Sequence, residues 1–172
     1  MKKVTKFIAL SVVMFSFAVV TFAQGVTASS PATATIITPI AITNTVVMSF
    51  GNLAVNNTIG TVILTPASTR SATGGVTFLP ATPGTITAAS FNITGLANAT
   101  YSITLPAAAT AISFGANTMT VDTWTSTPTP TGTLSAGGAQ TLTVGATLNV
   151  GASQAAGIYT SVTPFDVTVN YN

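Results

Sequence analysis

The sequence has no cysteine and no histidine among its 172 residues, and its two acidic residues accompany only four basic ones. Without cysteine there can be no disulfide bond, although small exported domains often depend on them. Without histidine the chain lacks the side chain that most often serves as a general base near neutral pH. Packing or assembly must therefore supply the stability, and most enzyme chemistry lacks the residues to perform it.

The first 23 residues have the pattern of a secretory signal peptide. Three lysines within the first six residues precede the apolar run Phe7–Val20, and small residues end at Ala23, before a cleavage site at Gln24. The apolar run is shorter than the ~20 residues that a membrane-spanning helix needs. We therefore expect cleavage after residue 23, export through the periplasm of a bacterium, and a single domain over residues 24–172 without a membrane-spanning helix.

Cleavage would leave very few charges on the mature chain. Only Arg70, Asp122 and Asp166 remain, so the side-chain net charge is 1 − 2 = −1. One arginine cannot neutralise a row of phosphates, which excludes a nucleic-acid partner. Two separate carboxylates give no clustered metal ligands, and the glycine pairs do not form a phosphate-binding motif. We expect no enzyme activity, and no catalytic, metal-binding or cofactor-binding residue.

Beta-branched residues and strand-like alternation dominate the mature sequence. Threonine is its commonest residue, and such side chains favour strands over helices. In Ala139 to Val150 the even positions from Leu142 onward are apolar, while threonine, glycine and asparagine fill the odd positions from Thr141 onward. Glycine and asparagine turns separate further short strands. This pattern predicts an all-β fold, an immunoglobulin-like β-sandwich of short antiparallel strands, with a closed barrel as the alternative.

Several local predictions follow the same alternation. Ala89–Thr94 and Ala99–Leu105 flank a turn at residues 95–98, which indicates a hairpin. The repetitive segment Thr125–Thr133 is predicted to be an extended surface loop. Shorter strands are predicted at Thr61–Thr65, Val76–Leu79 and Thr118–Trp124.

The C-terminal segment has the clearest two-faced pattern. Polar residues at 166, 168 and 170 alternate with an apolar face formed by Phe165, Val167, Val169 and Tyr171. The sequence stops one residue after this strand, with no tail to cover its edge. Exposed edges invite pairing with another strand, so we expect strand addition here.

The start of the mature chain offers a second alternating segment. One face of this segment consists of Ala32, Ala34, Ile36, Ile40 and Ile42. Because proline cannot donate to a strand ladder, Pro39 restricts the segment to a sheet edge or a bulge. The alternation fits equally a strand donated to a neighbouring subunit and the first strand of the chain's own sandwich.

The motif Gly157-x-Tyr159-Thr160, followed by an alternating strand that ends in 167–171 (Val-Thr-Val-Asn-Tyr), resembles the C-terminus of bacterial fimbrial subunits. Chaperone–usher pilins and spore-coat-U-like secreted proteins share that motif. The segment 132–135 (Gly-Thr-Leu-Ser), the strand 142–150 and residues 155–159 resemble more closely an uncharacterised family of exported, pilin-like bacterial domains described only as a domain of unknown function. The cysteine pair common in pilins is missing here.

This resemblance implies a structural subunit of a fimbria or other cell-surface assembly, joined by β-strand complementation. A periplasmic chaperone would read Phe165, Val167, Val169 and Tyr171, and the N-terminal face would be donated to copies of the chain or related subunits. The alternative from another class is a self-complete secreted adhesin or carbohydrate-binding module. For that function Trp124, the single tryptophan, would be exposed and stack on a sugar ring.

Overall fold

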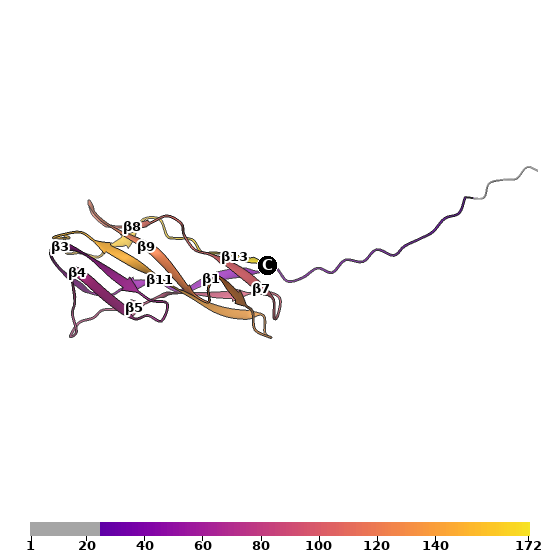
Figure 1. Cartoon of the computed structure of the whole chain (residues 1–172), viewed down its shortest axis with the longest axis horizontal. Helices are drawn as coiled ribbons and strands as arrows, with labels where there is room; N and C mark the ends of the chain where they lie inside the picture. Colours follow the sequence, from indigo (N-terminus) through magenta and orange to yellow (C-terminus); the bar gives the residue numbers. More distant parts are fainter. Residues whose placement is uncertain (1–24) are drawn as a thin grey trace, which may run out of the picture. The chain divides into compact units, whose positions relative to one another are not determined.

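The computed structural model describes residues 25–172, so the expected signal peptide lies outside the described residues. Ile36–Asn172 forms one compact unit, which consists of strands and connecting loops with no helix among the described residues (Figure 1). Residues 25–35 belong to a separate unit, and each of these residues is exposed and outside any strand. The all-β prediction is confirmed.

Thirteen strands build the compact unit. Their bounds are β1 (Ala41–Val46), β2 (Ser49–Phe50), β3 (Leu53–Leu64), β4 (Arg70–Phe78), β5 (Ile86–Thr87), β6 (Ala89–Thr94), β7 (Thr100–Thr104), β8 (Thr110–Phe114), β9 (Asn117–Thr127), β10 (Thr131–Thr133), β11 (Ala139–Val150), β12 (Thr160–Ser161) and β13 (Thr168–Tyr171).

All strand pairs are antiparallel. The largest sheet has the order β1-β6-β11-β9-β8-β12, and β3 joins it by pairing with both β11 and β4. A smaller sheet has the order β10-β7-β13, and β2 pairs with β5. In Figure 1, β3, β4 and β5 lie toward one end of the compact unit, and β1, β7 and β13 lie toward the other.

Strand β11 pairs with three other strands of the large sheet. Along one of its sides the partner strand changes halfway, at a glycine. Residues 139–144 pair with β6, whereas residues 146–150 pair with β3. At Gly145, between the two partners, an added Cβ would lie 2.2 Å from the carbonyl oxygen of Leu64. The predicted inward face of β11 is confirmed, because its even positions from Leu142 to Val150 are all buried.

Buried side chains form two apolar clusters. The β13 cluster contains Ala89, Phe91, Ile93, Tyr101, Leu134, Leu142, Val144 and Val169. The β3–β4 cluster contains Val62, Val76, Val121, Ala146, Leu148 and Val150. Two partly buried residues, Met48 and Trp124, pack against both clusters and therefore connect them.

The predicted hairpin of Ala89–Thr94 and Ala99–Leu105 is wrong, although both strands form. β6 is hydrogen-bonded on its two sides by β1 and β11, so it has no free side for β7. The connection between them crosses to the other sheet instead. It is held there by hydrogen bonds from Gly95 N–H to Gly138 C=O (2.9 Å) and from Asn98 N–H to Ser135 C=O (3.1 Å).

The loop predicted over Thr125–Thr133 is also too long. β9 continues through Thr127, which pairs with Thr143, and β10 begins at Thr131 and pairs with β7. Only residues 128–130, with their two prolines, remain outside the strands. Threonine is compatible with both a loop and an edge strand, so composition alone misjudged the boundaries.

Candidate strand-addition edge

Strand β13 is an edge strand, and its only hydrogen-bonded neighbour among the described residues is β7. The Asn172 N–H donates to Thr100 C=O (3.3 Å). Because backbone groups alternate sides along a strand, those of Thr168 and Asn170 also face β7. The backbone groups of Val169 and Tyr171 therefore face the opposite, open side. On β7, Ile103 N–H donates to Pro130 C=O on the β10 side (2.9 Å), as this alternation requires.

The side chains of the C-terminal segment alternate as the sequence predicts. Val169 is buried, and Phe165, Val167 and Tyr171 are partly buried against the β13 cluster. The ring of Phe165 lies 6.4 Å from that of Phe91 in an edge-to-face arrangement. The residues at 166, 168 and 170 are exposed. The four apolar side chains thus anchor the edge strand to the unit and leave its backbone as the available surface.

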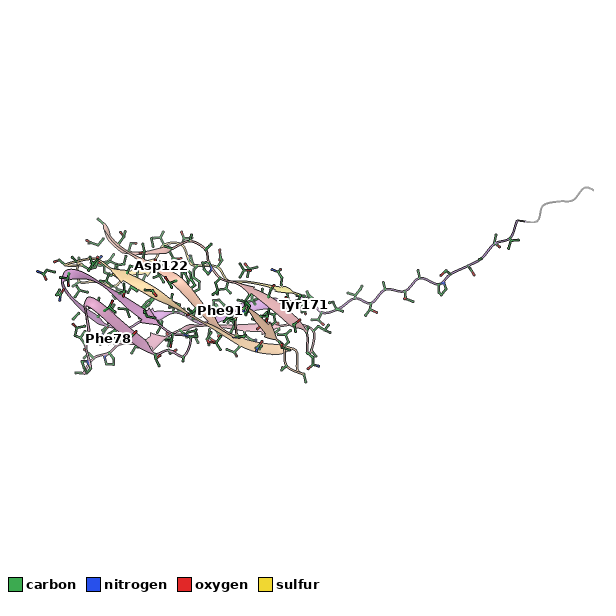
Figure 2. All side chains as sticks on the ribbon, in the orientation of Figure 1. Phe78, Phe91, Asp122 and Tyr171 are labelled. Carbon is green, nitrogen blue, oxygen red and sulfur yellow. The ribbon has the colours of Figure 1, made fainter. Side chains whose placement is uncertain are left out.

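The Tyr171 hydroxyl joins three segments of the chain. It accepts a hydrogen bond from Leu96 N–H (2.6 Å) and donates one to Thr38 C=O (2.8 Å). Figure 2 shows Tyr171 at the end of the compact unit opposite Phe78. The phenol therefore uses its donor and an acceptor site, and it connects β13 with the residues just before β1.

The structure divides the predicted N-terminal face into two groups. Ala32, Ala34 and Ile36 are exposed and lie outside any strand, with Ile36 97 % exposed. Ile40 and Ile42 pack against the β13 cluster of their own chain. In the single chain, residues 32–40 form no strand, and β1 begins at Ala41. Pro39 lies two residues before the start of β1 and has no N–H to donate to a strand ladder.

Trp124 is partly buried and is held by other side chains and the backbone. Its ring lies 4.4 Å from that of Phe165, and its indole N–H donates to Ala108 C=O (3.4 Å). It also packs against both apolar clusters. Trp124 therefore takes part in the packing of the unit.

The side chains of Tyr101 and Gln140, to which the sequence analysis gave no role, form a hydrogen bond between β7 and β11. Tyr101 is fully buried, its hydroxyl donates to Gln140 Oε1 (2.7 Å), and burial raises the pKa of this phenol. Gln140 Oε1 also accepts from Thr133 N–H (3.0 Å), which ties β10 to β11. Hydrophobic periodicity predicts that a tyrosine at an apolar position is buried. It does not predict which residue accepts a hydrogen bond from the tyrosine hydroxyl.

Arg70 is the only cation among the described residues and has no acidic partner there. Its guanidinium donates to the carbonyls of Phe50, Asn52 (3.2 Å) and Pro83 (3.4 Å), and it lies 4.2 Å above the ring of Phe78. Partial burial lowers the pKa of this guanidinium. Arg70 therefore fastens two loops to β4 and is not available as a free charge.

The Asp122 carboxylate is hydrogen-bonded to neutral side chains. Asp122 accepts hydrogen bonds from Asn149 Nδ2 (2.9 Å) and from the Thr123 hydroxyl (3.0 Å). Within residues 25–172, no three His, Cys, Asp or Glu side chains are close enough together to hold a metal ion. The same residues include no helix with the length and apolar character to cross a membrane.

Comparison with protein families matches residues 40–171 to the family described as "Domain of unknown function (DUF4402)". The match includes all thirteen strands and starts at Ile40, one residue before β1. Comparison with curated proteins and with solved structures gives no match.

Proposed function

Because the chain belongs to the DUF4402 family of domains of unknown function, which names no activity, we propose a role from its edge geometry. The protein is an exported, non-enzymatic structural subunit of a bacterial fimbria or other cell-surface assembly. Its subunits join by β-strand complementation, in which a segment of one subunit pairs with β13 of the next. The resemblance of the C-terminal motif to pilins supports this proposal.

The open side of β13 is the observation that carries the proposal. The backbone groups of Val169 and Tyr171 face away from β7, while apolar side chains fix the strand in place. Natural edge strands are usually protected by charge, proline or a covering segment. Here Asp166, just outside the strand, is the only charged residue between residues 123 and 172. An uncharged edge of this kind accepts another strand at little electrostatic cost.

The exposed N-terminal residues supply the donor. Residues 25–37 form no strand, and their even positions include Val26, Ala28, Ala32, Ala34 and Ile36. Val26 and Ile36 are 98 % and 97 % exposed. Because Ile40 and Ile42 are already packed in their own unit, the donated face lies in residues 26–36, further toward the N-terminus than the sequence predicts. We refer to residues 25–37 as the donor arm.

The finer features of the proposal rest on the same resemblance. The compact unit is proposed to be an immunoglobulin-like β-sandwich, preceded by a cleaved signal peptide. The subunit passes through the periplasm, where a chaperone reads the apolar face from Phe165 to Tyr171, and it then reaches the cell surface. Its partners are copies of itself or related subunits.

The test is an SDS gel of material sheared from producing cells, with and without boiling, probed with an antibody against the mature chain. Strand-complemented subunits should give a ladder of multimers that collapses to the monomer band only after boiling. A single monomer band under both conditions would contradict the proposal.

Two matched variants test the donor arm directly. Ile36→Asn places a polar group on the donated face, whereas Ile37→Asn makes the same change on the opposite face of an extended segment. We expect Ile36→Asn to remove the ladder and Ile37→Asn to retain it. Equal ladders from both variants would exclude residues 26–36 as the donated strand. Because both residues are exposed, neither change should unfold the compact unit.

A further inference from the structure

The edges of the two main sheets approach each other without pairing. β1 is an edge of the large sheet and β13 is an edge of the small sheet. The two strands are close in space, yet no ladder joins them in the described part of the chain. We call the place where they meet the seam. Under the proposed function, a partner's strand that pairs with the open side of β13 enters at this seam.

One hydrogen bond crosses the seam, from the Tyr171 hydroxyl to Thr38 C=O (2.8 Å). Thr38 stands two residues before Ile40, which packs against the β13 cluster, and two residues after the fully exposed Ile36. Pro39 lacks an N–H, so the ladder of β1 cannot continue through it. The phenol therefore holds the chain at the point where the packed unit ends and the exposed residues begin.

The turn at residues 95–96 contacts the Tyr171 hydroxyl. Leu96 N–H donates to the hydroxyl oxygen (2.6 Å), which leaves the phenolic proton to point at Thr38. At Gly95 an added Cβ would lie 2.3 Å from the same oxygen. The turn that carries Gly95 and Leu96 is itself fixed by the hydrogen bond from Gly95 N–H to Gly138 C=O (2.9 Å). Residues 95–96 thus give the phenol a backbone donor and the space that its oxygen occupies.

We infer that Tyr171 is a latch that closes the seam and restrains strand addition until it is released. According to this inference, an incoming strand that pairs with the backbone of Tyr171 displaces Thr38 from the phenol. Thr38 and Leu96 are both exposed, so water replaces the lost partners and release is reversible. This inference rests on the proposed function for its consequence, but the latch itself is a property of the single subunit.

The first experiment measures hydrogen exchange in the isolated subunit. Tyr171→Phe removes the hydroxyl and keeps the ring, so the fold should persist. Amides of residues 40–43 should exchange roughly threefold to tenfold faster, the factor expected for the net loss of about one hydrogen bond. Gly95→Ala should have the same effect by pushing the phenol away. Tyr159→Phe is the control, since its hydroxyl bonds to Gln154 and to Ala155 C=O instead.

Unchanged exchange at residues 40–43 in both Tyr171→Phe and Gly95→Ala would overturn the latch. An increase in Tyr159→Phe equal to that in Tyr171→Phe would overturn it as well, because the effect would then not be specific to the seam.

The second experiment measures the rate at which purified subunits form boiling-sensitive multimers. Tyr171→Phe should assemble roughly threefold to tenfold faster than the unsubstituted protein, because the seam opens more often. Assembly at an equal or slower rate would overturn the regulatory role even if exchange is faster. If the unsubstituted protein and the variant both stay monomeric, the proposed function fails. The exchange experiment still decides separately whether the latch exists.

Discussion

The β13 cluster and the β3–β4 cluster are both apolar, but they draw on different parts of the chain. The β3–β4 cluster combines Val62 of β3 and Val76 of β4 with buried residues of β9 and β11. The β13 cluster combines β6, β7 and β11 with the C-terminal strand, and it includes aromatic rings and the buried Tyr101–Gln140 hydrogen bond. Both clusters therefore depend on contacts between distant parts of the chain, but only the β13 cluster depends on the last strand of the domain.

This difference places the proposed assembly edge on the cluster that contains the C-terminal strand. β13 contributes Val169 and Tyr171 to its packing and has one hydrogen-bonded neighbour among the described strands. Regions with fewer paired backbone groups open more easily than the rest of a fold. Strand exchange is therefore expected at the β13 end, while the β3–β4 end stays closed. The predictions below test this contrast.

The largest expected effect comes from one substitution made in each cluster. Leu142 and Leu148 lie on the same face of β11 and are 0 % and 2 % exposed. Leu142→Ala and Leu148→Ala should each lower the free energy of unfolding by about 2–5 kcal/mol through lost contacts and a cavity. Denaturant titration measures this loss.

Hydrogen exchange then separates the two variants. Only Leu142→Ala should also accelerate exchange at residues 168–172, because Leu142 packs in the cluster that contains Val169. Equal acceleration of that strand in Leu148→Ala would show that the two clusters open as one.

Arg70 is expected to have the next largest effect, confined to the β3–β4 end. Arg70→Met keeps a side chain over Phe78 but removes the hydrogen bonds to the three backbone carbonyls. We expect a loss of about 1–3 kcal/mol in the free energy of unfolding, measured by thermal or chemical denaturation. Arg70→Lys should recover part of it, since it retains the charge but not the planar fork.

An Arg70→Met variant as stable as the unsubstituted protein would mean that water satisfies those carbonyls equally well. The assembly ladder should be unaffected in either case, because Arg70 is at the other end of the unit from β13.

A smaller and pH-dependent effect is expected from Tyr101 at the β13 end. Burial raises the pKa of this phenol above its ordinary value of 10.0. In the unfolded chain the phenol loses its proton first, so the folded state binds more protons and unfolding becomes easier as pH rises. Stability contributed by the neutral phenol should be complete below about pH 10 and lost above it.

The measurement is the denaturation midpoint between pH 7 and pH 11. Tyr101→Phe, which cannot ionise, should show a weaker decline above pH 10 than the unsubstituted protein. Identical pH profiles would assign the alkaline decline to other groups.

The sequence predicts the inward faces of the strands better than their pairing. Alternation in β11 and in residues 165–171 identified the buried positions, because a two-residue period has a direct physical counterpart in the pleat. It could not show that β6 and β7 belong to different sheets. A short glycine-containing turn suits a hairpin and a crossover alike, and only the occupied sides of β6 decide between them.

The candidate site was predictable to a similar extent. The apolar face of the C-terminal strand is visible in the sequence, whereas the Tyr171–Thr38 bond joins residues that are 133 positions apart. The sequence also could not predict that Ile36 is exposed while Ile40 packs against the β13 cluster, because both residues fit the same alternation. Packing within the unit, and not the pattern, determines which of them stays exposed.

The hydrogen bonds of the Arg70 guanidinium also bear on how the folded protein resists trypsin-like proteases. After Lys6 it is the only residue in the chain after which trypsin cleaves. Its side chain donates hydrogen bonds to backbone carbonyls and lies over an aromatic ring. Arg70 is also the first residue of β4, where it pairs with Leu64 of β3. Residues 25–172 thus offer such proteases a single peptide bond, and we expect it to become cleavable only when the β3–β4 end unfolds.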